Sequence, residues 1–132
     1  MNFLDTNICI YAIKNKYPNI VEHFKRHSPN DIKIPSIVKA ELLLGAEKSN
    51  FKSKTKSIIE QFLFPFEVIP FDDKATAFYA DIRAKLEKSG LVIGPNDLIV
   101  AAIVMAHNGC LITNNTNEFK RIKKLKIKNW TI

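Results

Sequence analysis

The chain opens with Met1-Asn2-Phe3-Leu4-Asp5-Thr6-Asn7, the stretch that indicates most about its fold. An apolar run ends at a carboxylate, a hydroxyl and an amide, and a second apolar series begins at Ile8. This pattern is typical of a short buried strand with polar groups at its tip. In an open parallel α/β sheet, ligands bind beyond the carboxyl ends of the strands, where the strand order reverses. We therefore expect Asp5, Thr6 and Asn7 to lie at a functional site.

The rest of the chain alternates between strand and helix patterns, which favours a parallel sheet with helices on both faces. Ser36 is predicted to be the N-cap of a helix over 37–48, and Asp72 and Asp73 to cap a helix that ends near Gly90. Pro95 suits the first position of a strongly apolar, central helix. Further strands are expected at 32–34, 66–70 and 110–112 and at the edge over 126–130, and further helices at 8–14, from 18, over 51–64 and from 118.

Composition indicates one globular domain over residues 1–132. The chain has 132 residues, of which 46% are hydrophobic and 25% charged, as in ordinary globular proteins. No apolar run reaches the roughly 18 residues of a membrane span, and Asp5 interrupts any signal-peptide pattern. We expect a cytoplasmic protein without a membrane partner. Cys9 and Cys110 have neither zinc nor disulfide spacing and are predicted to be reduced and buried.

The charge balance favours a polyanionic partner. Twenty Lys and Arg residues against thirteen Asp and Glu give a net charge of +7. Nucleic acid is the first class of partner that such a basic protein suggests.

Three acids have comparable positions: Asp5 at a strand tip, Glu41 on an apolar helix face, and Asp97 at the start of the central helix. Each has a structural alternative, since Asp5 and Asp97 suit helix N-termini and Glu41 could pair with a core Lys. Clustered carboxylates repel one another unless a divalent cation keeps them ionised. Oxygen ligands select Mg²⁺ or Mn²⁺, which can activate water and neutralise charge on a phosphodiester. A basic protein with such a site suggests a nuclease.

Other candidate sites are weaker. His23 and His27 lie four residues apart, but no third ligand follows at a useful spacing, so a solvated helix face explains them better than a metal site. The phenylalanines fall mostly in core-like patterns, which predicts no aromatic platform for stacking bases. A phosphatase with Asp5 as nucleophile would usually need an aspartate where Asn7 stands.

The sequence resembles a PIN domain, and most closely the VapC toxins of bacterial type II toxin-antitoxin pairs. Four segments carry the resemblance in order along the chain: Asp5-Thr6-Asn7, Ala40-Glu41-Leu42 with Gly45, Ile93-Gly94-x-x-Asp97-Leu98-Ile99, and Leu111-Ile112-Thr113-Asn114-Asn115 with Phe119. It implies a three-layer α/β/α fold around a five-stranded parallel sheet, and a Mg²⁺- or Mn²⁺-dependent endoribonuclease. Asp5, Glu41 and Asp97 match the metal ligands, and Thr6 and Thr113 match hydroxyls that bind the acids, metal waters or scissile phosphate.

One position departs from the family pattern. Many PIN domains have an aspartate where this chain has Asn115, and an amide neither carries charge nor acts as a base. Glu118 is the only acid nearby and could take that place, directly or through a water. In the alternative, Asn115 and Glu118 form a capping-box variant. The sequence leaves both open.

A basic segment follows the proposed site and is predicted to bind RNA phosphates, in preference to being only a solvated face. Its cations include Lys120, Arg121, Lys123 and Lys124. The resemblance further implies a VapB-like antitoxin, a homodimer, operator DNA bound only through the antitoxin, and a tRNA substrate such as the anticodon loop of initiator tRNA. The alternative is a PIN-like module that binds RNA or protein and has lost its chemistry.

Overall fold

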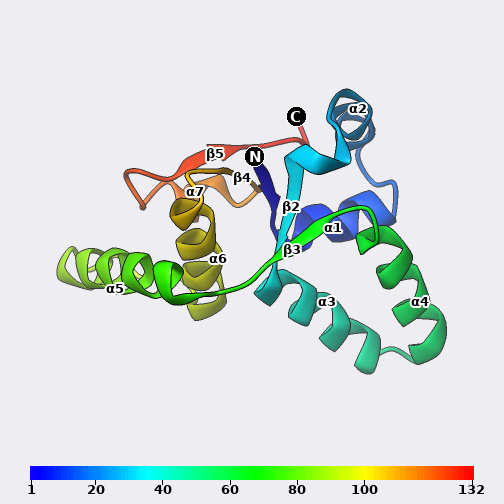
Figure 1. The fold of residues 1–132 in the computed structure, drawn as a ribbon, viewed down its shortest axis with the longest axis horizontal. Coiled ribbons are helices and arrows are strands. Elements are labelled where there is room, and N and C mark those ends of the chain that lie inside the picture. Colours follow the sequence, from blue (N-terminus) through cyan, green and yellow to red (C-terminus); the bar gives the residue numbers. More distant parts are fainter.

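The computed structural model describes residues 1–132, and a five-stranded parallel sheet forms its centre. The strand order is β3-β2-β1-β4-β5, with all four neighbouring pairs parallel (Figure 1). The strands are β1 (Asn2–Leu4), β2 (Ile32–Pro35), β3 (Glu67–Ile69), β4 (Cys110–Ile112) and β5 (Lys126–Lys128). The five-stranded parallel sheet that the sequence indicated is thus confirmed, with its last strand at an edge.

The strand order reverses beside β1, which lies between β2 and β4. Leu4 is in register with Ile112, so that both strands end at the same level. The Asp5 N–H continues this pairing and donates to the Ile112 carbonyl at 3.1 Å. Asp5 and Thr113 therefore leave the sheet side by side, at the position where open α/β sheets bind ligands.

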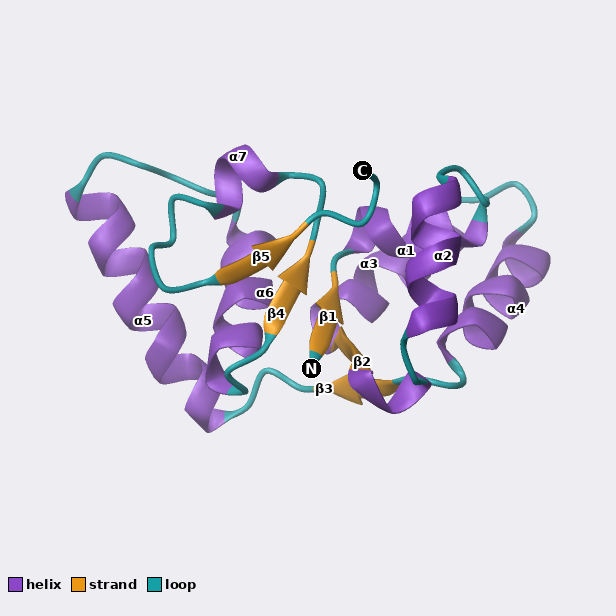
Figure 2. Ribbon diagram, turned by 90° about the horizontal axis from the view of Figure 1, so that it is seen from above, coloured by secondary structure: helices purple, strands orange, loops and turns teal.

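Seven α-helices connect the strands. They are α1 (Thr6–Ile13), α2 (Pro18–Arg26), α3 (Ser36–Glu47), α4 (Lys52–Leu63), α5 (Asp73–Lys88), α6 (Pro95–Ala106) and α7 (Thr116–Phe119), with a 3-10 turn at Pro29–Asp31. Figure 2 shows α5 and α6 on one side of the sheet and α1 to α4 on the other. No helix is both long and apolar enough to cross a membrane.

The central helix is α6, as its composition indicated. Seven of its residues are buried, and six of these pack in one core with residues of β1 and β4 such as Phe3 and Leu111. Pro95 occupies its first turn, where a missing N–H costs nothing. The buried face fixes the orientation of this helix and thereby the direction of Asp97.

Three local predictions were wrong. Ser36 is the first residue of α3 and not its N-cap, because Pro35 takes the cap position and no side chain caps the helix. Leu44 is 53% exposed, so the face of α3 that carries Glu41 is not continuously apolar. Phe51 and Phe64 flank α4 and are 72% and 89% exposed, so these aromatic side chains lie outside the core.

His23 of α2 and His27, the residue that follows this helix, have a structural role that the sequence did not indicate. The rings of His23 and His27 stack on buried Trp130, with centroids 4.8 Å and 4.9 Å from the indole. Burial and nearby cations lower the pKa of His23, which favours the neutral ring. The stack joins α2 to the chain end and replaces the predicted solvated face. Both cysteines are free, with Cys9 buried and Cys110 half-buried.

Candidate active site at the carboxyl edge of the sheet

Asp5 lies at the junction of β1 and α1 and has two roles there. Its Oδ1 accepts a hydrogen bond from the Ile8 N–H at 2.9 Å, so it is the N-cap of a helix that begins two residues before the predicted start. The side chain is only 8% exposed. Burial raises the pKa of Asp5 to about 6, against opposing hydrogen bonds from the Thr113 hydroxyl and the Ile8 N–H. Asp5 is therefore a helix cap, as the structural alternative predicted. Because the side chain is buried, its ionised form is nevertheless costly.

Glu41 joins the same site from α3. The Thr6 hydroxyl donates to Glu41 Oε1 at 2.7 Å across 35 residues of sequence. The alternative in which Glu41 pairs with a core lysine does not occur, since none of the six ion pairs includes it. The hydroxyl fixes one carboxylate oxygen and leaves the other free.

Asp97 projects from the first turn of α6 and is half-buried. Its pKa is raised to about 6, first by burial and then by the negative charges of Glu118, Asp5 and Glu41. The charges of Glu118, Asp5 and Glu41 all contribute to raising this pKa, so the four acids, which come from four separate segments of the chain, lie in one neighbourhood, called here the acid cluster.

Glu118 is held in the cluster by two hydrogen bonds. Its Oε1 accepts from the Gly94 N–H at 3.1 Å, and its Oε2 accepts from the side-chain amide of Asn115 at 2.9 Å. These bonds lower the pKa of Glu118. A capping box would instead direct Glu118 to the Asn115 N–H, which bonds to Thr113 Oγ1 at 2.9 Å. The capping-box alternative is thus not formed, and Asn115 acts as a donor to Glu118.

Two contacts near the acids were not predicted from the sequence. The Gly94 N–H ties the start of α6 to Glu118, and the Asn114 amide donates to the Tyr11 hydroxyl at 3.3 Å. Both join segments more than 20 residues apart, so local patterns could not indicate them. The available signal for the first contact was Gly94-Pro95, with Asp97 three residues after Gly94. This pattern marks a helix start, where backbone N–H groups are free to bind an acceptor such as a carboxylate.

The donor set fits a hard divalent cation. All four groups are carboxylates, none has a cationic partner within an ion pair, and two have raised pKa values that a cation would reverse. As the side chains stand, no three His, Cys, Asp or Glu residues are close enough together to hold one ion. Asp97 accepts no hydrogen bond, and one oxygen of Glu41 has no hydrogen-bond partner, so both side chains retain free oxygens.

The predicted basic residues have different surroundings. Arg121 lies near the acids, where its charge lowers the pKa of Glu118 and its guanidinium donates to the Val92 carbonyl at 2.7 Å. Lys120 is exposed at the end of α7. Lys123 and Lys124 line a cavity with residues of α5, and Arg121 lines it too. Of the basic segment, Arg121 is thus the residue that borders both the acids and this cavity.

Comparison with known proteins agrees with this architecture. The sequence matches the PIN domain family over residues 3–125. It is 47% identical to Ribonuclease VapC2 of Rickettsia felis over 96% of each chain. It is 36% identical to the tRNA(fMet)-specific endonuclease VapC of Shigella flexneri, over 97% of this chain and 96% of that protein.

Solved structures show the same fold. One chain in the crystal structure of VapBC2 from Rickettsia felis, bound to a DNA fragment from their promoter, superposes with a TM-score of 0.92 at 42% identity, covering 98% of each chain. One in DNA-bound VapBC from Salmonella typhimurium also gives a TM-score of 0.92, at 36% identity and 98% and 97% coverage. The fold, the order of the acids along the chain and these similarities together show that the protein belongs to the VapC family of PIN-domain ribonucleases.

Proposed function

We propose that Asp5, Glu41 and Asp97 bind a catalytic Mg²⁺ or Mn²⁺ ion, and that the protein hydrolyses RNA phosphodiester bonds as the toxin of a toxin-antitoxin pair. PIN-domain ribonucleases generally depend on a divalent metal. One observation supports the site above all others: buried Asp5 and half-buried Asp97 lie at the reversal of the strand order with raised pKa values, and neither has a cationic partner in an ion pair. When bound, such an ion activates water and neutralises charge on the phosphodiester.

The neighbouring side chains orient the acids. Thr6 holds one oxygen of Glu41 and leaves the other for the ion, and Thr113 supports the ionised form of Asp5. Both hydroxyls are preorganised by short hydrogen bonds, which lowers the reorganisation that catalysis requires.

Glu118 is proposed as the fourth site residue in place of the aspartate that Asn115 lacks. Because both of its oxygens accept hydrogen bonds, we expect it to reach the ion through a water and to add negative charge to the site. Asn115 then positions Glu118 and carries no charge of its own.

The substrate is proposed to be tRNA, with the anticodon loop of initiator tRNA as the target. This rests on 36% identity over nearly the whole chain with a protein named for tRNA(fMet) cleavage. The net charge of +7 favours a polyanion, and Arg121 and Lys120 are the cations proposed to contact phosphates beside the acids. A tRNA substrate also makes the cytoplasm the proposed location.

A VapB-like antitoxin and a homodimer are the proposed protein partners, with operator DNA bound only through the antitoxin. In support, the two similar solved structures are VapBC complexes bound to DNA, in one case to a promoter fragment. Four large apolar side chains of α3, α4 and their ends are exposed and could serve such interfaces: Leu44, Phe51, Ile58 and Phe64. Exposed apolar groups of this kind commonly mark protein-binding surfaces.

The test is cleavage of a total tRNA pool by antitoxin-free protein, with Mg²⁺ or Mn²⁺ against EDTA. The native chain is compared with Asp97→Asn and with Asp31→Asn, which makes the same chemical change at an exposed residue outside the cluster. We expect metal-dependent cuts at one site by the native and Asp31→Asn proteins and at least a hundredfold loss in Asp97→Asn.

The second candidate function, a non-catalytic PIN-like binding module, predicts a different outcome. It requires that the folded native protein binds RNA or an antitoxin but cuts no tRNA with either metal. Cleavage that persists in Asp97→Asn at the native rate would contradict the proposed metal site itself.

A further inference from the structure

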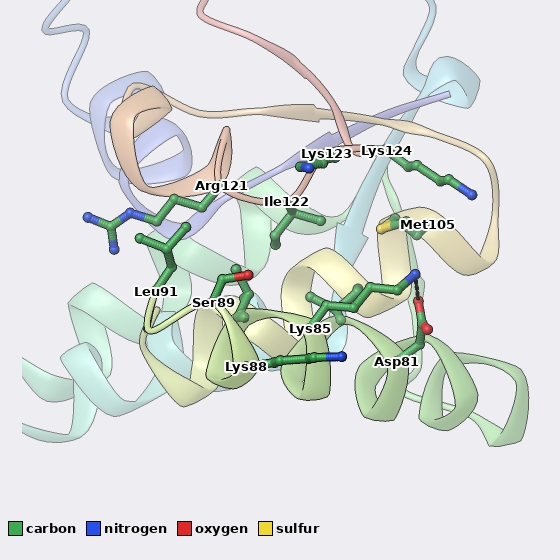
Figure 3. Close-up of a pocket in the computed structure, with 12 residues that line it drawn as sticks. Asp81, Lys85, Lys88, Ser89, Leu91, Met105, Arg121, Ile122, Lys123 and Lys124 are labelled. Atoms are coloured by element: carbon green, nitrogen blue, oxygen red, sulfur yellow. Dashed lines mark hydrogen bonds and ion pairs between the residues drawn. The ribbon is translucent and has the colours of Figure 1, made fainter.

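A cavity of about 380 Å³ lies between the C-terminal half of α5 and the segment that follows α7. Figure 3 shows Lys85 and Lys88 on α5 facing the loop that carries Lys123 and Lys124. None of the four clustered acids lines this cavity. It is therefore distinct from the proposed metal site, and its volume is within the range of small-molecule binding pockets.

The charges around the cavity are poorly balanced. Five cations line it, namely Lys85, Lys88, Arg121, Lys123 and Lys124, against the single acid Asp81. That acid is already paired with Lys85 at 3.1 Å. Lys88, Lys123 and Lys124 have no carboxylate partner in any ion pair. Like charges gathered around one cavity repel, so an anionic ligand would be favoured there.

The helix dipole explains only part of this arrangement. Lys85 and Lys88 lie in the last turns of α5, where cations are favourable. Lys123 and Lys124, however, belong to a different segment and lie beyond the end of α7, facing the same cavity. The dipole of α5 therefore does not explain why Lys123 and Lys124 lie there, and their charges repel those of Lys85 and Lys88.

The cavity also has apolar lining. Ile82 and Leu86 of α5, Met105 of α6 and Ile122 line it together with the lysines. A lining of apolar and cationic side chains matches a ligand that carries both a flat, weakly polar ring and a phosphate. A nucleotide of RNA has these two parts, whereas an acidic peptide offers carboxylates without the ring.

We propose that this cavity binds a nucleotide of the substrate RNA, with its phosphate on Lys88, Lys123 and Lys124, away from the bond that is cut. The proposal rests on the proposed ribonuclease function, since it takes the substrate to be RNA. Glu118 and Lys123 are five residues apart, so their Cα atoms are separated by at most roughly 18 Å. One folded RNA can therefore occupy both sites, and the cavity would select folded substrates over short fragments.

The experiment compares Lys88→Gln/Lys123→Gln with the native protein and with Lys48→Gln/Lys54→Gln, an equal charge change at exposed lysines outside the cavity. Steady-state cleavage is measured on full-length tRNA and on a short RNA that spans only the cut. For the cavity variant we expect a severalfold higher KM on tRNA, an unchanged kcat, and no change on the short RNA. The fall of tRNA affinity between 50 and 200 mM salt should shrink by about threefold for the loss of one phosphate contact.

Lys88→Arg/Lys123→Arg keeps the charge and should restore the native KM. Equal KM values for the native protein and the Gln variant on tRNA would overturn the proposal. If the KM values are equal and the Gln variant also binds the antitoxin more weakly, the cavity is assigned to protein binding. If the native protein cuts no RNA, the proposed function fails, and direct tRNA binding by the same variants still decides the role of the cavity.

Discussion

Replacing Asp5 by Asn should stabilise the metal-free protein while abolishing its activity. Asp5 is 8% exposed, and its pKa is raised from 3.8 to about 6 chiefly by burial. The folded protein therefore holds this proton more tightly than the unfolded chain. The contribution of Asp5 to the free energy of unfolding is therefore largest below pH 4 and decreases as the pH rises through 6. Above that pH, the free energy of unfolding is lower by about 3 kcal/mol because of this group alone.

The substitution removes this cost without removing the helix cap, because Asn is as good an N-cap as Asp. At pH 4 we expect almost no difference in the free energy of unfolding between Asp5→Asn and the native protein. At pH 8 in EDTA, we expect the free energy of unfolding of Asp5→Asn to be about 2–3 kcal/mol higher than that of the native protein. For a chain of this size that corresponds to a rise in Tm of roughly 10 °C.

The assay is thermal and urea unfolding of antitoxin-free protein at equal concentration, at pH 4 and pH 8, with and without Mg²⁺. Asp31→Asn, at an exposed carboxylate, is the matched control and should change neither curve. Mg²⁺ should raise the Tm of the native protein at pH 8 more than that of Asp5→Asn, since binding to the folded state stabilises it. If Asp5→Asn is less stable than the native protein at pH 8 in EDTA, the argument from the burial of an ionised carboxylate is wrong.

Three further predictions follow from single contacts. Thr6→Val removes the 2.7 Å hydrogen bond to Glu41 at nearly constant volume, so kcat should fall about tenfold with little change in Tm, as steady-state cleavage and calorimetry would show. Trp130→Ala removes a side chain that is 2% exposed, and urea unfolding should show a loss of about 3–5 kcal/mol. Gly109→Ala would place a Cβ 2.5 Å from the Phe3 ring, and the same measurement should show a loss of about 1–3 kcal/mol.

Much of the fold was predictable because its elements have strong local patterns. The short apolar run before Asp5 is favourable only as a buried strand. The strongly apolar segment after Pro95 is favourable only as a central helix. Errors occurred where a neighbour decides the outcome. Ser36 has good capping chemistry, but Pro35 occupies the cap position, and the helix begins one residue early.

The candidate site was predictable to a similar degree. Asp5, Glu41 and Asp97 were identifiable because each combines a carboxylate with an apolar context, which is costly without a partner. The choice between a capping box and a site residue for Glu118 was not, since both use the same spacing. The Gly94 N–H, 24 residues away in sequence, binds Glu118 and so excludes the capping box, while a role of Glu118 in the site stays a prediction.

The sequence by itself determined the sheet, the order of the acids and the basic character of the chain, because periodicity, residue type and charge are local properties. Only the tertiary structure decided which side chains from remote segments lie close enough to interact. It gathers four acids from separate segments, stacks His23 and His27 on Trp130, and brings Lys85 and Lys88 together with Lys123 and Lys124 around one cavity. Distances between remote segments depend on how the helices pack on the sheet, and no pattern within a segment specifies them.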